Sequence, residues 1–401
     1  MNKSKITLFN DKKDCCDCTA CKSICPKDAI YIYLDEYGFE YPKIDRNKCI
    51  ECGLCKKVCA FQNIEETNTP IETYVGVAKD ENILLKSASG GIFATIAQMY
   101  LQNKGVVFGA TLDNELNPIH MYVDDINLLN KLQGSKYVQS NIENTYREAK
   151  RFLIEGKKVL FSGTPCQIAG LKGYLMKDYD NLLTIDIICH GVPSPKFFKD
   201  YLKVMEEKLG GKIKEFKFRD KSMGWGLNGT LTYEYNGILK EKKIYGSESS
   251  YYHYFLNSSC YRENCYHCKY ACDNRPGDIT IGDYWGIEAA HPNLLGKGKL
   301  EEEKGISVVI ANTEKGKREI EKCDKFYRYS SEFSKARIKN EQLNKASEKG
   351  EKYSELMKIY KNEGYTGIEN LYYKEVGIRR YKSRVKAIIP LKIKRIVKQY
   401  I

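Results

Sequence analysis

The 401-residue chain is poor in the residues that most hydrolytic sites need, since it contains only five histidines. Neither H-E-x-x-H nor G-x-S-x-G occurs in it, so the usual zinc-protease helix and serine-nucleophile turn are absent. No apolar run approaches the roughly eighteen residues of a membrane-spanning helix. The first ten residues, MNKSKITLFN, lack the apolar core of a secretory signal. We therefore expect a cytoplasmic protein without hydrolytic machinery.

Cysteine, by contrast, is abundant. Sixteen cysteines are too many for a reducing compartment unless most of them are ligands. Eight of them form two runs with the same C-x2-C-x2-C-x3-C spacing, thirty-four residues apart. The first run is Cys15, Cys18, Cys21 and Cys25, and the second is Cys49, Cys52, Cys55 and Cys59.

This spacing holds 4Fe–4S clusters in bacterial ferredoxins, where the fourth cysteine of each run serves the other run's cluster. Three thiolates on one tight loop bind three iron corners, and the fourth corner needs a cysteine from elsewhere in the fold. We therefore predict two clusters. One is expected on Cys15, Cys18, Cys21 and Cys59, and the other on Cys49, Cys52, Cys55 and Cys25.

A disulfide framework and a zinc site both fit the cysteine runs less well than clusters do. Disulfides need an oxidising compartment, and zinc prefers two separated C-x2-C pairs. Cys16 lies beside Cys15 without disturbing the spacing, and we interpret it as a non-ligand. Ala60 follows Cys59 where Pro26 follows the first run, which changes nothing chemical.

The expected fold class is α+β, with four parts. Residues 1–61 form a two-cluster ferredoxin-type domain, 62–71 a polar linker, 72–330 a mixed α/β body and 331–401 a helical, basic C-terminal extension. Strands alternating with helices between residues 72 and 209 predict a partly parallel sheet. Asn236-Gly237 between two strand-like runs predicts a hairpin. After about residue 312 the chain is expected to be helical and charge-rich.

The net charge of +13 is concentrated at the C-terminus. Residues 377–401 carry nine Lys or Arg and no acid, which leaves the rest of the chain at only +4. A nucleic-acid-binding protein would show a basic face across its core, so we expect no nucleic-acid partner. Isoleucine and leucine interleave with the cations of the tail, which suits an anionic membrane surface or an acidic partner. A solvated terminal helix is the alternative.

A second group of cysteines lies in the body: Cys166, Cys189, Cys260, Cys265, Cys268 and Cys272. The last four read C-x4-C-x2-C-x3-C, which begins like the plant-type iron–sulfur loop. Alternatively, Cys265 and Cys268 supply one pair of ligands. Cys166 and Cys189, which each follow a predicted strand, then supply the other pair. Spacing alone does not choose between these two sets for a third cluster.

Three glycine-rich turns precede predicted helices. They are Ser89-Gly90-Gly91, Gln133-Gly134-Ser135-Lys136 and Ser162-Gly163-Thr164. Free N–H groups at a helix N-terminus bind phosphate, so a flavin or nucleotide pyrophosphate is the candidate ligand, although Ser and Gly are also ordinary caps. Gly224, Gly226 and Gly229 match G-x-G-x-x-G but precede a strand, which excludes the dinucleotide fingerprint. His190 is the histidine expected nearest a redox centre.

The body resembles the coenzyme F420 hydrogenase/dehydrogenase beta-subunit family. Six stretches between about residues 72 and 290 carry the resemblance: SASGGIFATIAQMYL, LQGSKYVQS, VLFSGTPCQIAGL, DIICHGVPSP, CYHCKY and GDITIGDYWG. The resemblance implies a flavin- and cluster-binding body that moves electrons between one-electron and two-electron carriers. The family's recurrent cysteines resemble Cys166, Cys189, Cys265 and Cys268. We therefore prefer that set for a third 4Fe–4S cluster, with a local set including Cys260 and Cys272 as the alternative.

The resemblance also implies FAD, held by Ser89, Gly90, Gly91, Gly134, Ser135 and Lys136. The archaeal hydrogenase subunits of this family use a deazaflavin coenzyme within a large complex, whereas the fused module and basic tail look like the stand-alone bacterial branch. We therefore expect an iron–sulfur flavoprotein oxidoreductase that passes electrons through FAD between its ferredoxin-type clusters and a two-electron organic substrate or cofactor. Its partners would be a redox protein or low-potential electron carrier and a small-molecule acceptor or donor. The alternative is a non-catalytic electron-transfer subunit that serves a partner enzyme.

Overall fold

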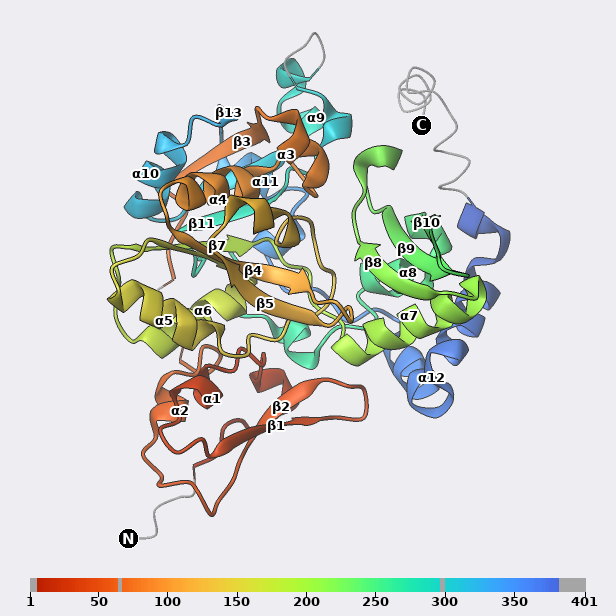
Figure 1. The fold of residues 1–401 in the computed structure, drawn as a ribbon, viewed down its shortest axis with the longest axis horizontal. Helices are drawn as coiled ribbons and strands as arrows, with labels where there is room; N and C mark the ends of the chain where they lie inside the picture. The colour runs from red at the N-terminus through yellow and green to blue at the C-terminus, as the bar shows by residue number, and fades with distance from the viewer. Residues whose placement is uncertain (1–5, 64–66, 296–299, 382–401) are drawn as a thin grey trace.

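The computed structural model describes residues 6–63, 67–295 and 300–381, and a mixed eight-stranded sheet forms the centre of that part (Figure 1). The strand order is β13-β3-β12-β11-β7-β6-β4-β5. The strands are β3 (Glu72–Ala78), β4 (Val106–Leu112), β5 (Pro118–Val123), β6 (Val159–Gly163), β7 (Leu182–Ile187), β11 (Ile279–Asp283), β12 (Ser307–Ala311) and β13 (Phe326–Ser331).

Strands β4, β6, β7 and β11 are parallel to one another. Their sequences, such as VLFSG in β6 and LLTIDI in β7, are almost continuously apolar and buried, as expected for parallel strands covered on both faces. Strands β12, β3 and β13 extend the sheet antiparallel on one side, and β5 does so on the other. The carboxyl ends of β6, β7 and β11 therefore meet at one edge, where ligands bind in sheets of this kind.

Helices cover both faces of the large sheet. They are α3 (Glu81–Lys86), α4 (Ile92–Gln102), α5 (Thr145–Ile154), α6 (Pro165–Leu175) and α10 (Glu314–Lys322). Because side chains alternate along a strand, Val107 and Leu160 pack with α4 on one face. Phe108 and Phe161 pack with α5 and α6 on the other face.

The N-terminal part consists of α1 (Ala20–Ile24), β1 (Ile30–Leu34), β2 (Glu40–Ile44) and α2 (Leu54–Lys57). Strands β1 and β2 form an antiparallel hairpin, so the two strands expected between the cysteine runs are present. Figure 1 shows this part against α5 and α6. Ala20, Val58 and Phe61 share a buried core with Ile168 and Leu171 of α6. The cysteine-rich part therefore packs directly on the body.

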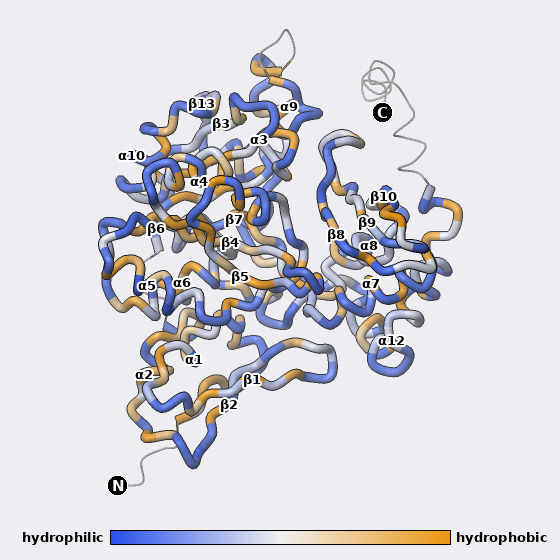
Figure 2. The backbone as a smooth tube through the Cα atoms, viewed as in Figure 1, coloured by the Kyte–Doolittle hydropathy of each residue, from blue (hydrophilic) through white to orange (hydrophobic). Residues whose placement is uncertain are grey.

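A third layer lies beside the large sheet. It contains α7 (Pro195–Leu209), β8 (Lys212–Lys217), β9 (Gly229–Tyr235), β10 (Ile238–Ile244), α8 (Ser250–Leu256) and α12 (Tyr353–Val376). The predicted hairpin joins β9 to β10, with φ of 52° at Asn236 and 75° at Gly237, as this type of turn requires. Aromatic side chains, including Phe198 and Tyr201, fill its core. Figure 2 shows hydrophilic stretches mainly in the outer loops.

The structure corrects the sequence-based expectation in two places. The chain is not wholly helical after residue 312, because β13 pairs with β3 from Phe326 opposite Ala78 to Ser331 opposite Thr73. The turn Gln133-Gly134-Ser135-Lys136 is not followed by a helix, since residues 135–144 are extended or turning and α5 begins only at Thr145. Two short helices, α9 (Ile287–Ala290) and α11 (Phe333–Ala336), were not predicted either.

The C-terminal extension is described only as far as residue 381. Helix α12 is followed by a 3-10 helix at Gly377–Tyr381. The remainder of the basic tail, residues 382–401, lies outside the described residues, so its expected helix and surface contact stay predictions. Within the described ranges, no helix is both long enough and apolar enough to cross a membrane.

Candidate functional site

The two N-terminal cysteine runs share a loop conformation as well as a spacing. Asp17 and Glu51 have φ of 55° and 53°, and Thr19 and Gly53 have φ of 56° and 78°. Each pair is thirty-four residues apart, the same offset as the cysteines. Loops with such left-handed residues can turn successive N–H groups inward as a concave nest, which binds anions and iron–sulfur clusters. The loop backbone therefore suits the predicted cofactor.

The first set of thiols combines cysteines from both runs: Cys15, Cys18, Cys21 and Cys59. Their charges interact, so the four side chains lie close together. Burial raises the pKa of Cys15 to about 11, and the charge of Cys59 adds to the shift. Buried thiolates are unfavourable unless a metal compensates their charge. Cys59, the last cysteine of the second run, thus lies near the first run, and its role as a cluster ligand stays a prediction.

The second set surrounds a small cavity next to β1 and β2. Its cysteines are Cys25, Cys49, Cys52 and Cys55. Ile30 and Ile44 form part of the apolar wall. The Sγ of Cys25 accepts a hydrogen bond of 3.3 Å from the Ala29 N–H, a contact that tunes iron–sulfur sites. Cys52 is exposed to solvent, so this set lies at the surface of the molecule.

The third set assembles from three distant segments of the body. Cys166 is the second residue of α6, Cys189 follows β7, and Cys265 and Cys268 lie at a 3-10 helix over Glu263–His267. Cys166 and Cys189 approach because β6 and β7 are parallel neighbours. Burial raises the pKa of Cys189 to about 12, and the charges of Cys166 and Cys268 add to the shift. Cys265 interacts with the other three.

The two remaining cysteines of the alternative local set lie elsewhere. Cys260 is buried in the aromatic core of α7, α8 and α12, and burial alone raises its pKa. The Sγ of Cys272 donates to the carbonyl oxygens of Lys269 and Asn274, at 3.5 Å and 3.3 Å. The described geometry therefore brings the strand-end set together and leaves Cys260 and Cys272 out of it.

Cys16 occupies a position that the sequence did not reveal. Its side chain is buried, and Cys18 and Cys166 both lie close enough to shift the pKa of its thiol. It thus lies between the first and third sets. We interpreted Cys16 only as a cysteine that leaves the spacing undisturbed, because nothing local indicates a contact with a residue 150 positions away.

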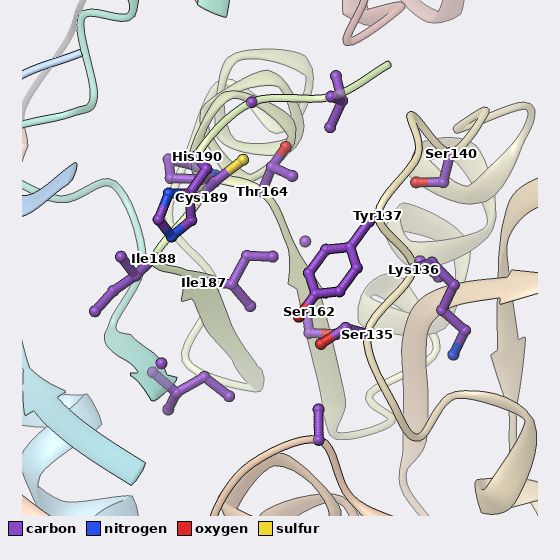
Figure 3. A pocket seen from close by; sticks show the side chains of 18 of the residues that line it. Ser135, Lys136, Tyr137, Ser140, Ser162, Thr164, Ile187, Ile188, Cys189 and His190 are labelled. Atoms are coloured by element: carbon purple, nitrogen blue, oxygen red, sulfur yellow. The ribbon is translucent and has the colours of Figure 1, made fainter. Parts of the chain in front are cut away.

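A cavity of about 600 Å³ opens at the carboxyl ends of the parallel strands and is lined by the third set. Ile187, Ile188, Cys189 and His190 form one wall, and residues 135–140 form the opposite wall (Figure 3). Ser162 and Thr164 lie between these walls in Figure 3. Ligand pockets have volumes of roughly 300 to 1,000 Å³. The cavity is therefore large enough for an organic cofactor beside the cysteines.

Five of the six predicted flavin contacts line this cavity: Ser89, Gly91, Gly134, Ser135 and Lys136. Gly90 is not among the lining residues, because its N–H donates to Ser307 Oγ at 2.9 Å. A side chain at Gly90 would lie 2.3 Å from the Gly76 carbonyl oxygen, so packing against β3 explains this glycine. Gly91, with φ of 84°, precedes the first turn of α4.

Lys136 is held by its own turn. Its Nζ donates to the carbonyl oxygens of Gln133 at 2.8 Å and of Gly134 at 3.3 Å. Burial lowers its pKa to about 7. In Figure 3 the Nζ points away from Cys189. Lys136 therefore stabilises the loop in this conformation instead of reaching across the cavity.

One polar group of the cavity was not predicted as a site. Asp283, the last residue of β11, accepts hydrogen bonds from Arg219 at 2.6 Å and from Trp225 Nε1 at 3.1 Å. The Trp225 ring stacks on Trp285 at 4.6 Å. Asp283 and Trp285 belong to the GDITIGDYWG stretch, so the resemblance contained the signal but no local pattern assigned it a role. His190 lines the same cavity, and burial lowers its pKa.

The spacing of the thiols differs from that of a site for one metal ion. Among the residues that the structure describes, no three His, Cys, Asp or Glu side chains converge closely enough to hold one. A single zinc ion needs its ligands within about 2.3 Å of one point, whereas a cluster spreads four thiolates over the corners of a cube.

Comparison with known proteins identifies relatives of the body. Residues 156–332 match the family model that describes the C terminus of the beta subunit of coenzyme F420 hydrogenase/dehydrogenase. No curated protein matches the chain. Among solved structures, one similar chain comes from the xenon-derivatised F420-reducing NiFe hydrogenase complex of Methanosarcina barkeri. The two chains are 16% identical in sequence, with a TM-score of 0.41, and the match covers 78% of this chain and 95% of that chain.

Proposed function

We propose that the chain is an iron–sulfur flavoprotein oxidoreductase, starting from the match of residues 156–332 to the family model for the C terminus of coenzyme F420 hydrogenase/dehydrogenase beta subunits. The family relates it to hydrogenase and dehydrogenase subunits, which supports a role in redox electron transfer. In the proposed reaction, electrons pass between a one-electron carrier and a two-electron organic substrate or cofactor. The coenzyme named in the family description, coenzyme F420, is one candidate for that two-electron partner.

The observation that carries the proposal is the convergence of twelve cysteines in three sets of four. Each of the first two sets combines three cysteines of one run with the last cysteine of the other run. The third set lines the cavity and comes from segments nearly one hundred residues apart, from Cys166 to Cys265. Cysteines that only fill a hydrophobic core are not expected to gather in sets of four. Cysteines that bind a cluster must do so, because one cluster takes four thiolate ligands.

The cavity also offers suitable contacts for FAD. Gly91 is the N-cap of α4 and provides no side-chain cap, so free N–H groups and the helix dipole favour a pyrophosphate there. The N-terminus of α6 is closed by Pro165 and by the capping box of Thr164 and Gln167. Ser89, Gly134 and Ser135 add small polar side chains and open backbone to the same wall. Lys136 would keep the Gln133 turn in place. When bound, a flavin supplies both one-electron and two-electron chemistry.

The chain's own residues position and enclose the reacting groups. Asp283 is fixed by Arg219 and Trp225, so its carboxylate has one orientation at the cavity wall. Burial lowers the pKa of His190, which is therefore neutral at pH 7 and able to accept or donate a hydrogen bond. Ile187 and Ile281 line the cavity with apolar surface and limit the access of water. No residue is assigned as the acid or base.

The experiment is anaerobic purification of the full chain, followed by assays of iron, sulfide and flavin. Three clusters predict about twelve irons per chain together with one flavin. Cys268→Ala should lose about four irons, whereas Cys272→Ala, its neighbour with backbone partners only, should lose none. A chain with iron but no flavin would contradict the flavoprotein assignment. A chain with neither would contradict the whole proposal.

A second candidate is a non-catalytic electron-transfer subunit. It is favoured by the exposed second set, because Cys52 and Ile50 (57% exposed) present a surface on which a redox protein could dock. Reduction assays with the isolated chain distinguish the two. An oxidoreductase transfers electrons to an organic acceptor such as coenzyme F420 or NAD, whereas a subunit reduces artificial dyes only.

A further inference from the structure

Arg262 connects the first and third sets of cysteines. Its backbone belongs to the third set, because its N–H donates to the Val192 carbonyl oxygen and its own carbonyl oxygen accepts from the Cys265 N–H, both at 2.9 Å. Its side chain extends in the other direction, into the N-terminal part. One residue thus spans the boundary between the two cysteine sets.

The guanidinium group lies against the Cys15 loop. Its Nε donates to the Cys15 carbonyl oxygen at 2.9 Å, and its Nη2 donates to the Glu40 carbonyl oxygen at 2.7 Å. Nη2 is also 3.9 Å from the Sγ of Cys15. The Cζ atom lies 4.1 Å from the centre of the Tyr41 ring. These contacts fix the cation beside a predicted cluster ligand.

The charge of Arg262 is buried without a hydrogen-bonded carboxylate. The residue is 0% exposed. Asp17 acts on it only through its charge at a distance. By contrast, Arg275 near the third set is neutralised by Asp186, with contacts of 2.7 Å and 3.1 Å. Gln139 lies between Arg262 and Asp17, accepting from Arg262 Nη1 at 3.4 Å and donating to Asp17 Oδ2 at 3.2 Å. Burying a cation that no carboxylate contacts directly costs several kcal/mol, and the thiolates around a cluster would add negative charge beside it.

We propose that Arg262 is a positioning residue that raises the reduction potential of the cluster held by Cys15, Cys18, Cys21 and Cys59. The inference rests on the proposed function, since it requires that cluster to be present. A fixed positive charge attracts the extra electron of the reduced cluster and so stabilises the reduced form. The attraction is stronger inside a protein than in water, because the interior has a lower dielectric constant. The step is a one-electron reduction by an external one-electron carrier, with no bond made and no proton moved.

Within the described ranges, no buried cation lines the cavity of the second set. Burial raises the pKa of the Cys55 thiol, and the charges of Cys52 and Cys49 add to the shift. Lys27 lines the small cavity but is exposed, so water and salt screen its charge. Arg262 therefore raises the potential of the inner cluster relative to the outer one. An electron that enters at the surface is then more stable beside the body.

The test compares neutral and charged replacements of Arg262 in the full, anaerobically purified chain. Iron is counted first, and the midpoint potentials are then measured by redox titration with electron paramagnetic resonance detection. Arg262→Gln keeps a hydrogen-bond donor without the charge. At a fixed potential, it should lower the reduced-to-oxidised ratio of one cluster at least tenfold. This corresponds to a fall in the midpoint potential of about 59 mV for a one-electron couple. Arg262→Lys keeps the charge and should change the ratio less than threefold.

Further variants assign and control the effect. Cys52→Ala removes the signal of the second set, and Cys268→Ala removes that of the third, so the shifted signal is assigned by elimination. Arg147→Gln is the matched control. Like Arg262, it reaches from the body to the N-terminal part, where its Nε donates to the Ser23 carbonyl oxygen at 3.1 Å. Its side chain, however, is 43% exposed. Its potentials should equal those of the original chain.

The outcomes separate this inference from the proposed function. A chain without iron contradicts the proposed function. A chain with about twelve irons whose potentials are the same in Arg262→Gln overturns the inference alone, as does a shift confined to the second or third set. If Arg262→Gln fails to fold, Arg262→Met, which is neutral and of similar length, replaces it in the same comparison with Arg262→Lys.

Discussion

Cys16 and Cys18, two positions apart near the N-terminus, have different expected roles. Cys16 lies close to Cys18 and Cys166, but the crossed first set is complete without it. We expect Cys16→Ala to retain all of the iron. Cys18→Ala should lose about four irons per chain, because one corner of a cluster loses its thiolate. Iron assay and visible absorption of the two variants make the comparison, and loss of iron from Cys16→Ala would show that Cys16 is a ligand.

His120 gives the molecule a defined pH dependence at the scale of one side chain. Its ring is 3% exposed, with Nδ1 2.8 Å from Ser140 Oγ and Nε2 3.0 Å from the Ser162 carbonyl oxygen. Burial, with a smaller effect of Lys136, lowers its pKa to about 4. The unfolded value is about 6.5. Below pH 6.5 the unfolded chain therefore binds a proton that the folded chain does not.

The free energy of unfolding should accordingly fall by up to about 1.4 kcal/mol per pH unit between pH 6.5 and 4 because of His120. His120→Gln keeps a neutral polar group and removes this contribution. Urea unfolding of the original chain and the variant at pH 7.5 and pH 5.5 measures it. The difference in stability between the two chains should shrink by about 1 kcal/mol at the lower pH. A pH-independent difference would contradict the prediction.

Helix α6 brings the third set and the N-terminal part together, and its glycines make the approach possible. A Cβ at Gly170 would lie 2.7 Å from the Cys18 Cβ and 2.8 Å from the Tyr146 Oη. At Gly173 it would lie 2.6 Å from the Val58 carbonyl oxygen. The face of the helix that meets the cysteine loops therefore has no room for side chains.

Gly170→Ala should destabilise the chain although alanine is the better helix former. The propensity gain is about 1 kcal/mol, whereas overpacking costs about 1 to 3 kcal/mol. Denaturant unfolding and iron content should both decrease. Gly226→Ala is the control, because the nearest atom to its added Cβ is Asn228 Nδ2 at 3.8 Å, and it should change neither. A more stable Gly170→Ala chain would show that the N-terminal part does not pack as described.

Some strands were predicted from their own sequences, and others were missed. Strands β6 and β7 were predicted closely, because they are buried on both faces and read as apolar runs. Strands β8 (KIKEFK) and β13 (FYRYSS) were missed. Each lies at the edge of its sheet and is mostly polar, so its pairing depends on a partner strand instead of its own composition. The Gln133 turn was misread because Gly and Ser begin loops as readily as helices.

The cysteine sets differ in the same way. Spacing within two loops is enough to propose the members of the first two sets, because three of the expected ligands of each are local. The third set depends on the parallel pairing of β6 with β7, which brings Cys166 to Cys189. Local spacing therefore left two alternatives open. Arg262 carried no sequence signal at all, since its role comes from contacts with Cys15 and Glu40, more than 200 positions away.

At the scale of the whole molecule, the three sets lie in an order from surface to cavity. The second set is outermost, with Cys52 exposed. The first set shares a buried core with α5 and α6 through Cys18. Cys16 links it to Cys166, and the third set lines the 600 Å³ cavity. The large ligand space is thus at the inner end of a series that begins at the protein surface.

This order makes a kinetic prediction. Cys52→Ala removes a ligand of the outermost set, so reduction of the cavity cofactor by a reduced ferredoxin should slow at least tenfold. A small two-electron reductant that enters the cavity should act at an unchanged rate, because it does not use the outer set. Cys272→Ala is the matched control, since its thiol contacts only backbone oxygens. Anaerobic stopped-flow absorption with each reductant measures both rates. Equal slowing by both reductants would indicate a general loss of structure, and no slowing with ferredoxin would place the carrier's docking surface at another set.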